Sequence, residues 1–359
     1  MTDTGDQLGA PSNDPVVVLD RVGRRFGEVW ALQDLSLTVP AKSITVLLGP
    51  NGAGKTTATR IITGALEAQL GAVRVFGMDP AVEGEAVRRR CGVVSAKPAL
   101  YDRLSGRANL AYSAELYGLG RGPEVADRIH QAADRYGIDH ALDKQVGGYS
   151  TGMKTRLALA RSVLHEPDLL LFDEPTSGLD PESSHAVLEM IQAMSNDGVT
   201  VVMCTHLLLE AEGLAQQVVV MEGGTDLVAG PPDELTRRYW PTPVVRLDAA
   251  DPSMLALVEA LPGVVGFDPV GAGASELAGM SIPEQRAGGA IDVRIDSGER
   301  IPDIVAALVE RGVRLTRVEP HVPSLEDLYF AVRQQHVDEA RVLADDGGRR
   351  LAPERIGRP

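Results

Sequence analysis

The sequence predicts an α/β domain with a doubly wound, mainly parallel sheet and a helical insertion, followed by a small α+β domain. Strand-like apolar runs alternate with helical patterns up to about residue 230, and a shorter alternation begins after residue 240. Between them, Gly-Pro-Pro at 230–232 interrupts both patterns, as expected at a boundary. The expected ranges are a flexible leader at 1–14, a first domain at 15–239 with its insertion at about 79–165, a second domain at 240–335, and a disordered tail at 336–359.

The first domain starts with strand-like runs at 16–20 and 35–39 on either side of a Gly-containing turn, and a third run at 44–48. A helical pattern begins at Lys55, with Ile61, Ile62, Leu66 and Leu70 spaced for one buried face, and ends at Gly71. Little strand signal follows until 148, but helical stretches do, among them 108–117 and 123–136. Strands are expected again at 169–172, 199–204 and 218–221, with a helix at 181–195.

The second domain has a shorter pattern of its own. Its expected elements are a strand at 244–247, a helix at 254–261, strands at 264–267 and 291–295, a helix at 304–313, a strand at 315–318 and a final helix at 325–332. The order β-α-β-β-α-β predicts a ferredoxin-like appendage. A Gly- and Ala-rich stretch at 271–289 predicts a loose loop.

Composition and charge narrow the class of protein. The 359 residues are 44% hydrophobic and 24% charged, which is ordinary for a globular chain. A formal net charge of -15 repels phosphate backbones and argues against a general nucleic-acid binder. No apolar run reaches the roughly 18 residues of a membrane span, and the polar start lacks the features of a secretory signal, so a cytosolic chain is expected. Cys91 and Cys204 lie outside any CxxC pattern, which favours packed, reduced thiols.

A phosphate-binding loop lies between the expected strand at 44–48 and the helix that begins at Lys55. It fits the pattern G-x-x-x-x-G-K-[ST], whose glycines let backbone N–H groups turn inward around an anion, while the following helix adds its positive end. Lys55 is expected to neutralise the β- and γ-phosphates, and the Thr56 hydroxyl to bind Mg²⁺. The expected binding residues, including the next threonine, are Gly49, Pro50, Asn51, Gly52, Ala53, Gly54, Lys55, Thr56 and Thr57.

A second group of motifs indicates which family of nucleotide-binding proteins the chain resembles. Tyr-Ser-Thr-Gly-Met-Lys at 149–154 is followed by Leu-Leu-Leu-Phe-Asp-Glu-Pro at 169–175 and Ser-Gly-Leu-Asp at 177–180. In this order and spacing, they resemble the signature motif, Walker B strand and D-loop of ABC ATPases, a likeness that covers residues 16 to about 239. The resemblance implies that the chain binds ATP and Mg²⁺, hydrolyses ATP, and pairs with a second ATPase subunit, in the simplest case as a homodimer.

The resemblance also assigns catalytic roles. Asp173 would hold Mg²⁺ through its water shell, and Glu174 would be the general base that orients and polarises the attacking water. His206 matches the switch histidine, which hydrogen-bonds the γ-phosphate, so Lys55, Glu174 and His206 form the expected catalytic group. Taken alone, an acidic pair at a strand end is often only solvated, and a histidine after a strand is often structural.

Further residues are assigned to the nucleotide in the same way. Ser150, Thr151 and Gly152 would open a helix that points at ATP held by the other subunit, and Asp180 would cross the interface between the two subunits. Phe26 falls where these ATPases keep an aromatic ring that stacks on adenine. Without the resemblance, Ser150 reads as a helix N-cap and Phe26 as a core residue.

Three positions depart from the family pattern. Ala96 replaces the usual glutamine of the loop entering the insertion, and an alanine can reach neither Mg²⁺ nor the lytic water. The signature has Thr151 where glycine is usual, and Lys42 replaces a common turn glycine. The Ala96 departure leads to the hypothesis that the subunit hydrolyses ATP slowly alone and that another residue of this loop transmits the movement.

The end of the chain suggests the branch of the family. Pro-Ser-Leu-Glu-Asp-Leu-Tyr at 323–329 is similar to the end of ATPase subunits of bacterial drug- and sodium-efflux exporters, including the daunorubicin-resistance type. The segments 101–110 and 152–154 also resemble that branch of the family. This implies a separately encoded membrane permease, which selects the substrate, and a peripheral location on the cytosolic face of the membrane. Two alternatives stay open: a soluble ABC ATPase acting on ribosomes or DNA, and a weakly hydrolysing regulatory module. The single set of motifs and the absence of heptads speak against the first, and Ala96 motivates the second.

Overall fold

The computed structural model describes residues 14–269, 289–321 and 323–345. Contacts within the chain divide it into two compact units, one before and one after the bond between Pro231 and Pro232. This division precedes the end of the first domain expected at 239, because the helix that follows Pro231 belongs to the second unit. Except for Asp14 and Gly289, the expected leader and the expected loop at 271–289 lie outside the described residues.

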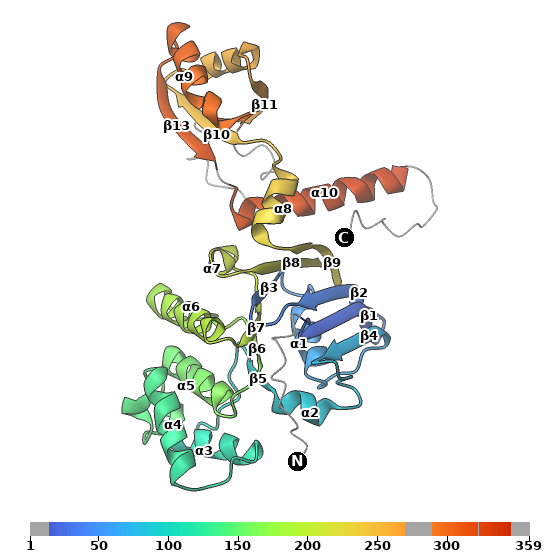
Figure 1. The fold of residues 1–359 in the computed structure, drawn as a ribbon, viewed down its shortest axis with the longest axis vertical. Coiled ribbons are helices and arrows are strands. Elements are labelled where there is room, and N and C mark those ends of the chain that lie inside the picture. Colours follow the sequence, from blue (N-terminus) through green and yellow to red (C-terminus); the bar gives the residue numbers. More distant parts are fainter. Residues whose placement is uncertain (1–13, 270–288, 322, 346–359) are drawn as a thin grey trace, which may run out of the picture. The chain divides into compact units, whose positions relative to one another are not determined.

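Nine strands of the first unit form one sheet in the order β4-β1-β2-β9-β8-β3-β7-β6-β5 (Figure 1). The strands are β1 (Val17–Phe26), β2 (Val29–Val39), β3 (Ile44–Leu48), β4 (Leu70–Val75), β5 (Cys91–Val94), β6 (Leu169–Asp173), β7 (Thr200–Thr205), β8 (Gln217–Glu222) and β9 (Thr225–Gly230). From β8 to β5 all pairs are parallel, whereas β1 pairs antiparallel with β2 and β4, and β9 with β8. The sheet therefore has the expected parallel part and, in addition, an antiparallel arm.

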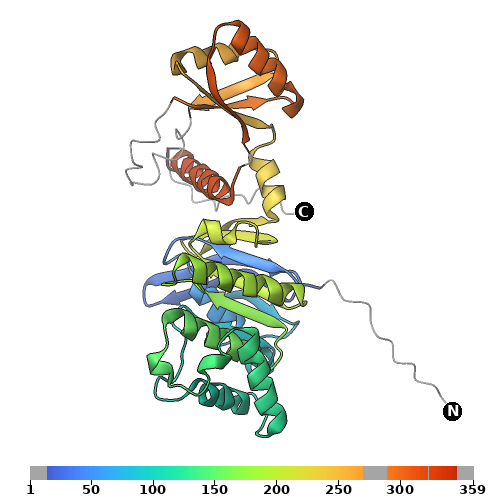
Figure 2. The same ribbon diagram turned by 90° about the vertical axis from the view of Figure 1, so that its left-hand side faces the viewer.

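The helices of the first unit differ in where they pack. They are α1 (Lys55–Ile62), α2 (Gly84–Arg89), α3 (Gly106–Leu116), α4 (Pro123–Arg135), α5 (Thr151–Val163), α6 (Pro181–Asn196) and α7 (Leu208–Ala211), with short 3-10 helices at Asp139–Ala141 and Val146–Gly148. Helices α3, α4 and α5 contact one another and form the green helical group of Figure 1. Helix α6 instead lies along the sheet against β7 (Figure 2). The helical insertion is therefore α3 to α5.

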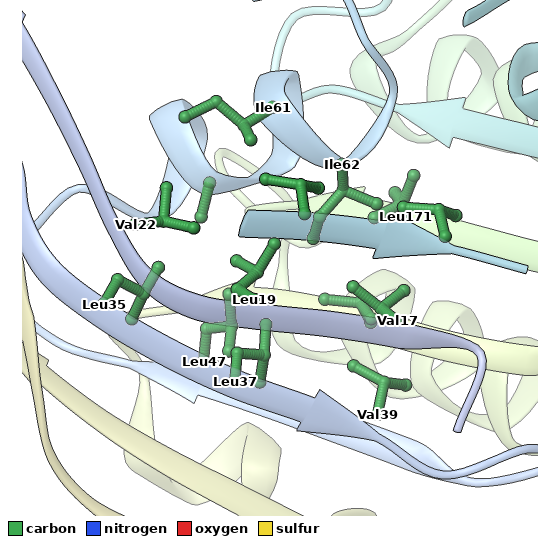
Figure 3. Packing of buried hydrophobic residues seen from close by; sticks show 14 of the residues in the cluster. Val17, Leu19, Val22, Leu35, Leu37, Val39, Leu47, Ile61, Ile62 and Leu171 are labelled. Carbon is green, nitrogen blue, oxygen red and sulfur yellow. The ribbon is translucent and has the colours of Figure 1, made fainter. Parts of the chain in front are cut away.

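Burial explains why the central strands are mostly apolar. Every residue of β3 and of β7 is buried, as expected for parallel strands covered on both faces. On one face, Ile61 and Ile62 of α1 pack against side chains of β1 and β6, among them Leu19 and Leu171 (Figure 3). This packing fixes α1 against the sheet, so that the loop between β3 and α1 turns at the carboxyl end of β3.

Two predictions for this unit were wrong. Helix α1 ends at Ile62, because Gly64 takes the left-handed backbone (φ 65°) that closes many helices, and Leu70 begins strand β4 with half of its surface exposed. The stretch at 79–165 is not helical throughout, since β5 lies within it and pairs with β6. A strand of four residues between two helices carries too few alternating positions to produce a clear sequence signal.

The second unit has a four-stranded antiparallel sheet in the order β11-β12-β10-β13. Its strands are β10 (Val244–Ala249), β11 (Val264–Pro269), β12 (Ile291–Ile295) and β13 (Leu315–His321), and its helical elements are α8 (Pro232–Tyr239), the 3-10 helix η3 (Pro252–Ala260), a short 3-10 helix at Gly298–Arg300, α9 (Ile301–Glu310) and α10 (Leu325–Asp345). Buried side chains of the sheet pack with those of η3 and α9, and Figure 2 shows the helices of this unit beside its sheet. This order of elements and strands is the predicted ferredoxin-like arrangement, although its first helix is of the 3-10 type.

The prediction of a disordered tail was wrong for the residues of the tail that belong to helix α10. The helix continues to Asp345, so residues 336–345 are helical, and 346–359 lie outside the described residues. Its start is a reciprocal cap: the Ser324 N–H donates to Asp327 Oδ2 at 2.8 Å, and the Asp327 N–H donates to Ser324 Oγ at 3.1 Å. The Ser-Leu-Glu-Asp run therefore has a structural role, since it begins a helix that contacts α8.

Candidate active site

The loop at 49–54 turns between β3 and α1 with two glycines in the left-handed region, Gly52 (φ 86°) and Gly54 (φ 103°). A Cβ on Gly54 would lie 2.6 Å from the carbonyl oxygen of Ala31, and one on Gly49 would lie 2.4 Å from that of Met221. Glycine is required at both positions because neighbouring backbone leaves no room. Gly54 is also the N-cap of α1, and no described side chain caps this helix, so its first N–H groups are left for an anion.

Lys55 is the first residue of α1 and points back into this loop. Only 6% of its surface is exposed, and its Nζ donates to the carbonyl oxygens of Gly49 at 2.5 Å and Pro50 at 3.3 Å. The same Nζ lies 3.5 Å from Glu174 Oε1. A buried ammonium group is thereby held where the loop would surround a phosphate.

Thr56 and Asp173 bring two oxygen ligands together from separate elements. The Thr56 hydroxyl on α1 donates to Asp173 Oδ2 at the end of β6, at 2.8 Å. Hydroxyl and carboxylate oxygens are what Mg²⁺ prefers, and Mg²⁺ is bound in such sites through one or two protein oxygens and substrate phosphates. The donor set fits a magnesium ion bound together with a nucleotide.

Glu174 follows Asp173 in a strained conformation. Its φ is 51°, in the left-handed region that residues other than glycine rarely adopt, and its N–H donates to the carbonyl of Cys204 on β7 at 2.9 Å. Its Oε2 lies 2.8 Å from His206 Nδ1. Its other oxygen, Oε1, is buried and accepts no hydrogen bond from the described residues. One carboxylate oxygen is thus held by histidine, while the other lies within ion-pair distance of Lys55.

The strand register explains why these residues meet. Leu48 pairs with Thr205, and Cys204 pairs with Asp173, so the carboxyl ends of β3, β7 and β6 lie side by side. The phosphate loop, Glu174 and His206 follow these three ends. This edge of a parallel sheet is where α/β proteins bind ligands.

The signature and D-loop residues lie apart from this cluster. Ser150 Oγ accepts from the Met153 N–H at 3.2 Å and caps α5, and Asp180 Oδ1 accepts from the Ser183 N–H at 2.9 Å and caps α6. Among the described residues, no hydrogen bond or ion pair joins either one, or Thr151 or Gly152, to the phosphate loop. A Cβ on Gly152 would meet Ser183 Oγ at an ordinary 3.5 Å. The chain itself therefore does not require glycine at 152.

Three other positions singled out in the sequence lie at the surface or in turns. Phe26 ends β1 with 48% of its surface exposed, so it is not a core residue, and the Arg24 guanidinium lies 5.1 Å from its ring centre. Lys42 adopts φ 56°, the conformation for which a turn glycine is usual. Ala96 is exposed in the loop after β5.

A second carboxylate near Glu174 and His206 was not among the residues expected from the sequence. Glu210 Oε2 accepts from Thr176 Oγ1 at 2.6 Å and from Thr205 Oγ1 at 3.4 Å. Burial raises the pKa of the Glu210 carboxyl, and the two hydroxyl groups, which stabilise its charged form, lower it. Only the neighbouring position of Thr205 and His206 could have drawn attention to it, since Thr176 is 34 positions away from Glu210.

We expect Gly54→Ala to destabilise the first unit more than Gly52→Ala. Both glycines are left-handed, which costs an alanine about 1–2 kcal/mol. A Cβ at 54 also approaches Ala31 O and Leu32 Cδ2 to 2.6 Å, whereas one at 52 meets nothing within 4 Å. Thermal unfolding without nucleotide measures the difference, and equal losses for the two variants would contradict it.

Within the parts of the chain that the structure describes, no helix is both long and apolar enough to cross a membrane.

Comparisons with known proteins identify the family. Residues 32–177 match the model of the ABC transporter family. The chain is 37% identical over 220 residues to the ABC transporter ATP-binding protein NatA of Bacillus subtilis (60% of this chain, 89% of NatA), and 33% identical over 317 residues to the daunorubicin resistance ATP-binding protein DrrA3 of Streptomyces coeruleorubidus (88% and 95%).

Solved structures agree with this assignment. An ATP-binding subunit of an ABC transporter matches with a TM-score of 0.57 and 28% identity over 62% of this chain and 93% of its own. CbiO1 of Clostridium perfringens, part of the ABC transporter complex cbiONQ, matches with a TM-score of 0.57 and 26% identity over 62% and 90%. The chain therefore belongs to the ABC transporter family, as one of its ATP-binding, ATP-hydrolysing subunits.

Proposed function

We propose that this protein hydrolyses Mg-ATP as a homodimer and thereby drives export through a separate membrane permease. The convergence of Lys55, Thr56, Asp173, Glu174 and His206 at one edge of the sheet is the observation that carries the proposal. The arrangement combines a phosphate-binding loop, oxygen ligands for a metal, and a base whose buried Oε1 accepts no hydrogen bond from the described residues and lies 3.5 Å from Lys55 Nζ.

The residues of this chain have distinct tasks in the proposed reaction. The N–H groups of the loop and Lys55 bind the phosphates, and Thr56 and Asp173 hold Mg²⁺, which neutralises charge on the phosphates when bound. Glu174 Oε1 takes a proton from the attacking water while the water oxygen bonds to the γ-phosphorus and ADP leaves; this oxygen is buried, lies 3.5 Å from Lys55 Nζ and accepts no hydrogen bond from the described residues. The bond from His206 Nδ1 to Glu174 Oε2 keeps the carboxylate turned so that Oε1 faces the site.

A second copy of the chain would complete each site. Helix α5 has 13 residues, and its start at Ser150, Thr151 and Gly152 leaves room for a Cβ at 152 within the chain. A glycine that its own chain does not need is explained if a phosphate of the partner's nucleotide approaches the backbone there. Asp180 caps α6 at Ser183, whose Oγ lies 3.5 Å from a Cβ placed on Gly152, so the D-loop lies beside the same surface. Phe26, with its exposed ring, would stack on the adenine.

Mixing two inactive variants tests this arrangement. Lys55→Ala removes the phosphate loop's cation, and Gly152→Asp places a negative charge at the start of α5, so each homodimer should be inactive. Their mixed dimer contains one site with both lesions and one intact site. Random pairing of equal amounts should restore about a quarter of the wild-type sites, because half of the dimers are mixed and half of their sites are intact. A mixture as inactive as its components would contradict an independently active site shared between two copies.

The names of the relatives support an export role. NatA is an ABC transporter ATP-binding protein, DrrA3 is a daunorubicin resistance ATP-binding protein, and a third relative, 33% identical over 254 residues, is a Nod factor export ATP-binding protein of Rhizobium johnstonii. CbiO1 is part of a transporter complex. By analogy, this chain would act at the cytosolic face of the membrane, bound to a permease that selects the substrate.

Ala96 favours a second candidate function, a nucleotide-dependent regulatory module with little turnover. Its methyl group lies exposed in the loop after β5 and can contact neither a metal nor a water through a polar atom. Slow hydrolysis by the purified homodimer that accelerates with a permease would favour the transporter. Slow hydrolysis under every condition would favour the module, and a high rate without any partner would contradict the idea that Ala96 limits turnover.

A further inference from the structure

Glu210 lies on α7, just after His206, and holds two buried hydroxyl groups. Thr176 is 3% exposed and Thr205 is 0% exposed, so each hydroxyl group needs a partner inside the protein. Glu210 Oε2 accepts from both, at 2.6 Å and 3.4 Å. Charged acceptors make the stronger hydrogen bonds of proteins, so the 2.6 Å bond from Thr176 is the stronger of the two, and the longer bond from Thr205 completes the link between the threonines.

The two threonines belong to the two loops that carry the catalytic pair. Thr176 lies two positions after Glu174 in the loop that leaves β6, and Thr205 directly precedes His206 at the end of β7. The Glu174 N–H already joins these loops through the carbonyl of Cys204, at 2.9 Å. Thr205 Oγ1 also accepts from the Leu207 N–H at 3.0 Å, so the same hydroxyl group orients the chain on both sides of His206.

The contact between Glu174 and His206 therefore lies between two sets of hydrogen bonds that join the same two loops. On one side is the backbone bond from Glu174 to Cys204, and on the other is the Glu210 carboxylate with its two threonines. Glu174 has a left-handed φ of 51°, a conformation that persists only when surrounding contacts hold it. Loosening one of these sets would leave the 2.8 Å contact between Glu174 and His206 less well defined.

We propose that Glu210 is a positioning residue of the catalytic site, which holds Glu174 and His206 in register through Thr176 and Thr205. The proposal rests on the proposed function of Glu174 as the base. Glu210 touches neither Glu174 nor His206 through a hydrogen bond among the described residues, so its effect is indirect.

Steady-state ATP hydrolysis by the purified full-length protein, with Mg²⁺, tests the proposal. We expect Glu210→Ala to lower kcat by about tenfold to a hundredfold while KM for ATP changes less than about threefold, because misplaced catalytic groups cost turnover and the phosphate loop is untouched. Glu210→Gln keeps an acceptor oxygen for both threonines and should retain at least about a third of the wild-type kcat. The matched control is Glu189→Ala on α6, whose side chain is 68% exposed and pairs with His185.

A double variant separates positioning from general loss of stability. If Glu210 acts through Thr176, then Glu210→Ala combined with Thr176→Val should be little worse than Glu210→Ala alone, because the residues form one unit. A kcat within twofold of wild type for Glu210→Ala would overturn the proposal, as would a Gln variant as impaired as the Ala variant. A KM that rises in proportion to the loss of kcat would overturn it too. Should Glu210→Ala fail to fold, Thr176→Val alone gives the same split of kcat against KM.

Failure of this proposal can be told apart from failure of the proposed function. Wild type and Glu174→Gln are measured beside the Glu210 variants. Turnover that Glu174→Gln abolishes and Glu210→Ala preserves removes only the role of Glu210. Turnover that survives in Glu174→Gln removes the base on which both proposals depend.

Discussion

Glu174→Gln should reduce turnover by about 10²–10⁴-fold and leave an ATP-loaded dimer that does not separate. The amide has nearly the same shape as the carboxylate, but it cannot accept the proton that Oε1 of Glu174 is placed to take. The variant also removes a negative charge 3.5 Å from Lys55 Nζ, next to the loop that binds the phosphates. Binding should therefore persist or become tighter while the chemical step is lost.

Phosphate release measures the loss of turnover, and size-exclusion chromatography with Mg-ATP measures the dimer. Glu189→Gln on the exposed surface of α6 is the matched control and should behave as wild type in both assays. Wild-type hydrolysis by Glu174→Gln would reject the assignment of the base. Loss of hydrolysis without a trapped dimer would reject the sandwich of two nucleotides between two copies.

Lys55→Ala should weaken ATP binding by at least about thirtyfold, the equivalent of roughly 2 kcal/mol for truncating one partner of a buried, hydrogen-bonded charge pair. The Lys55 side chain is 6% exposed, and its Nζ donates to the carbonyl of Gly49. Its removal takes away the cation that faces the phosphates and leaves the Glu174 carboxylate without its ion-pair partner. Both changes weaken the binding of a negatively charged ligand at the loop.

The shift of the unfolding temperature with added Mg-ATP reports this affinity, since a ligand stabilises the folded state in proportion to RT ln(1 + [L]/Kd). The control is Lys144→Ala, an exposed lysine in the loop before α5. It should keep the full shift that Lys55→Ala loses. An unchanged shift in Lys55→Ala would contradict the role of this lysine in binding phosphate.

Local patterns predicted the elements around the phosphate loop well. Strand β3 spans Ile44–Leu48 as expected, and α1 begins at Lys55, because a mainly apolar strand followed by a glycine-rich turn and an amphipathic helix is a local signal. Elements with weaker local signals were missed. Strand β4 is at the edge of the sheet and half-exposed, and β5 has four residues. The end of α10 was predicted to be disordered because the tail at 336–359, to which it belongs, is charged and contains glycine and proline, whereas the helix continues to Asp345.

The sequence alone determined which chemical groups are present: a phosphate loop with Lys55 and Thr56, an acidic pair after an apolar run, and a histidine after another. Only the tertiary structure brought them together, because the order β3-β7-β6 joins strands that are far apart in the chain. The left-handed φ of Glu174 and the hydrogen bond between Thr176 and Glu210 were likewise decided only by the tertiary structure. Residue spacing encodes which face of a strand or helix is buried, whereas strand order and contacts between loops depend on the packing of the whole sheet.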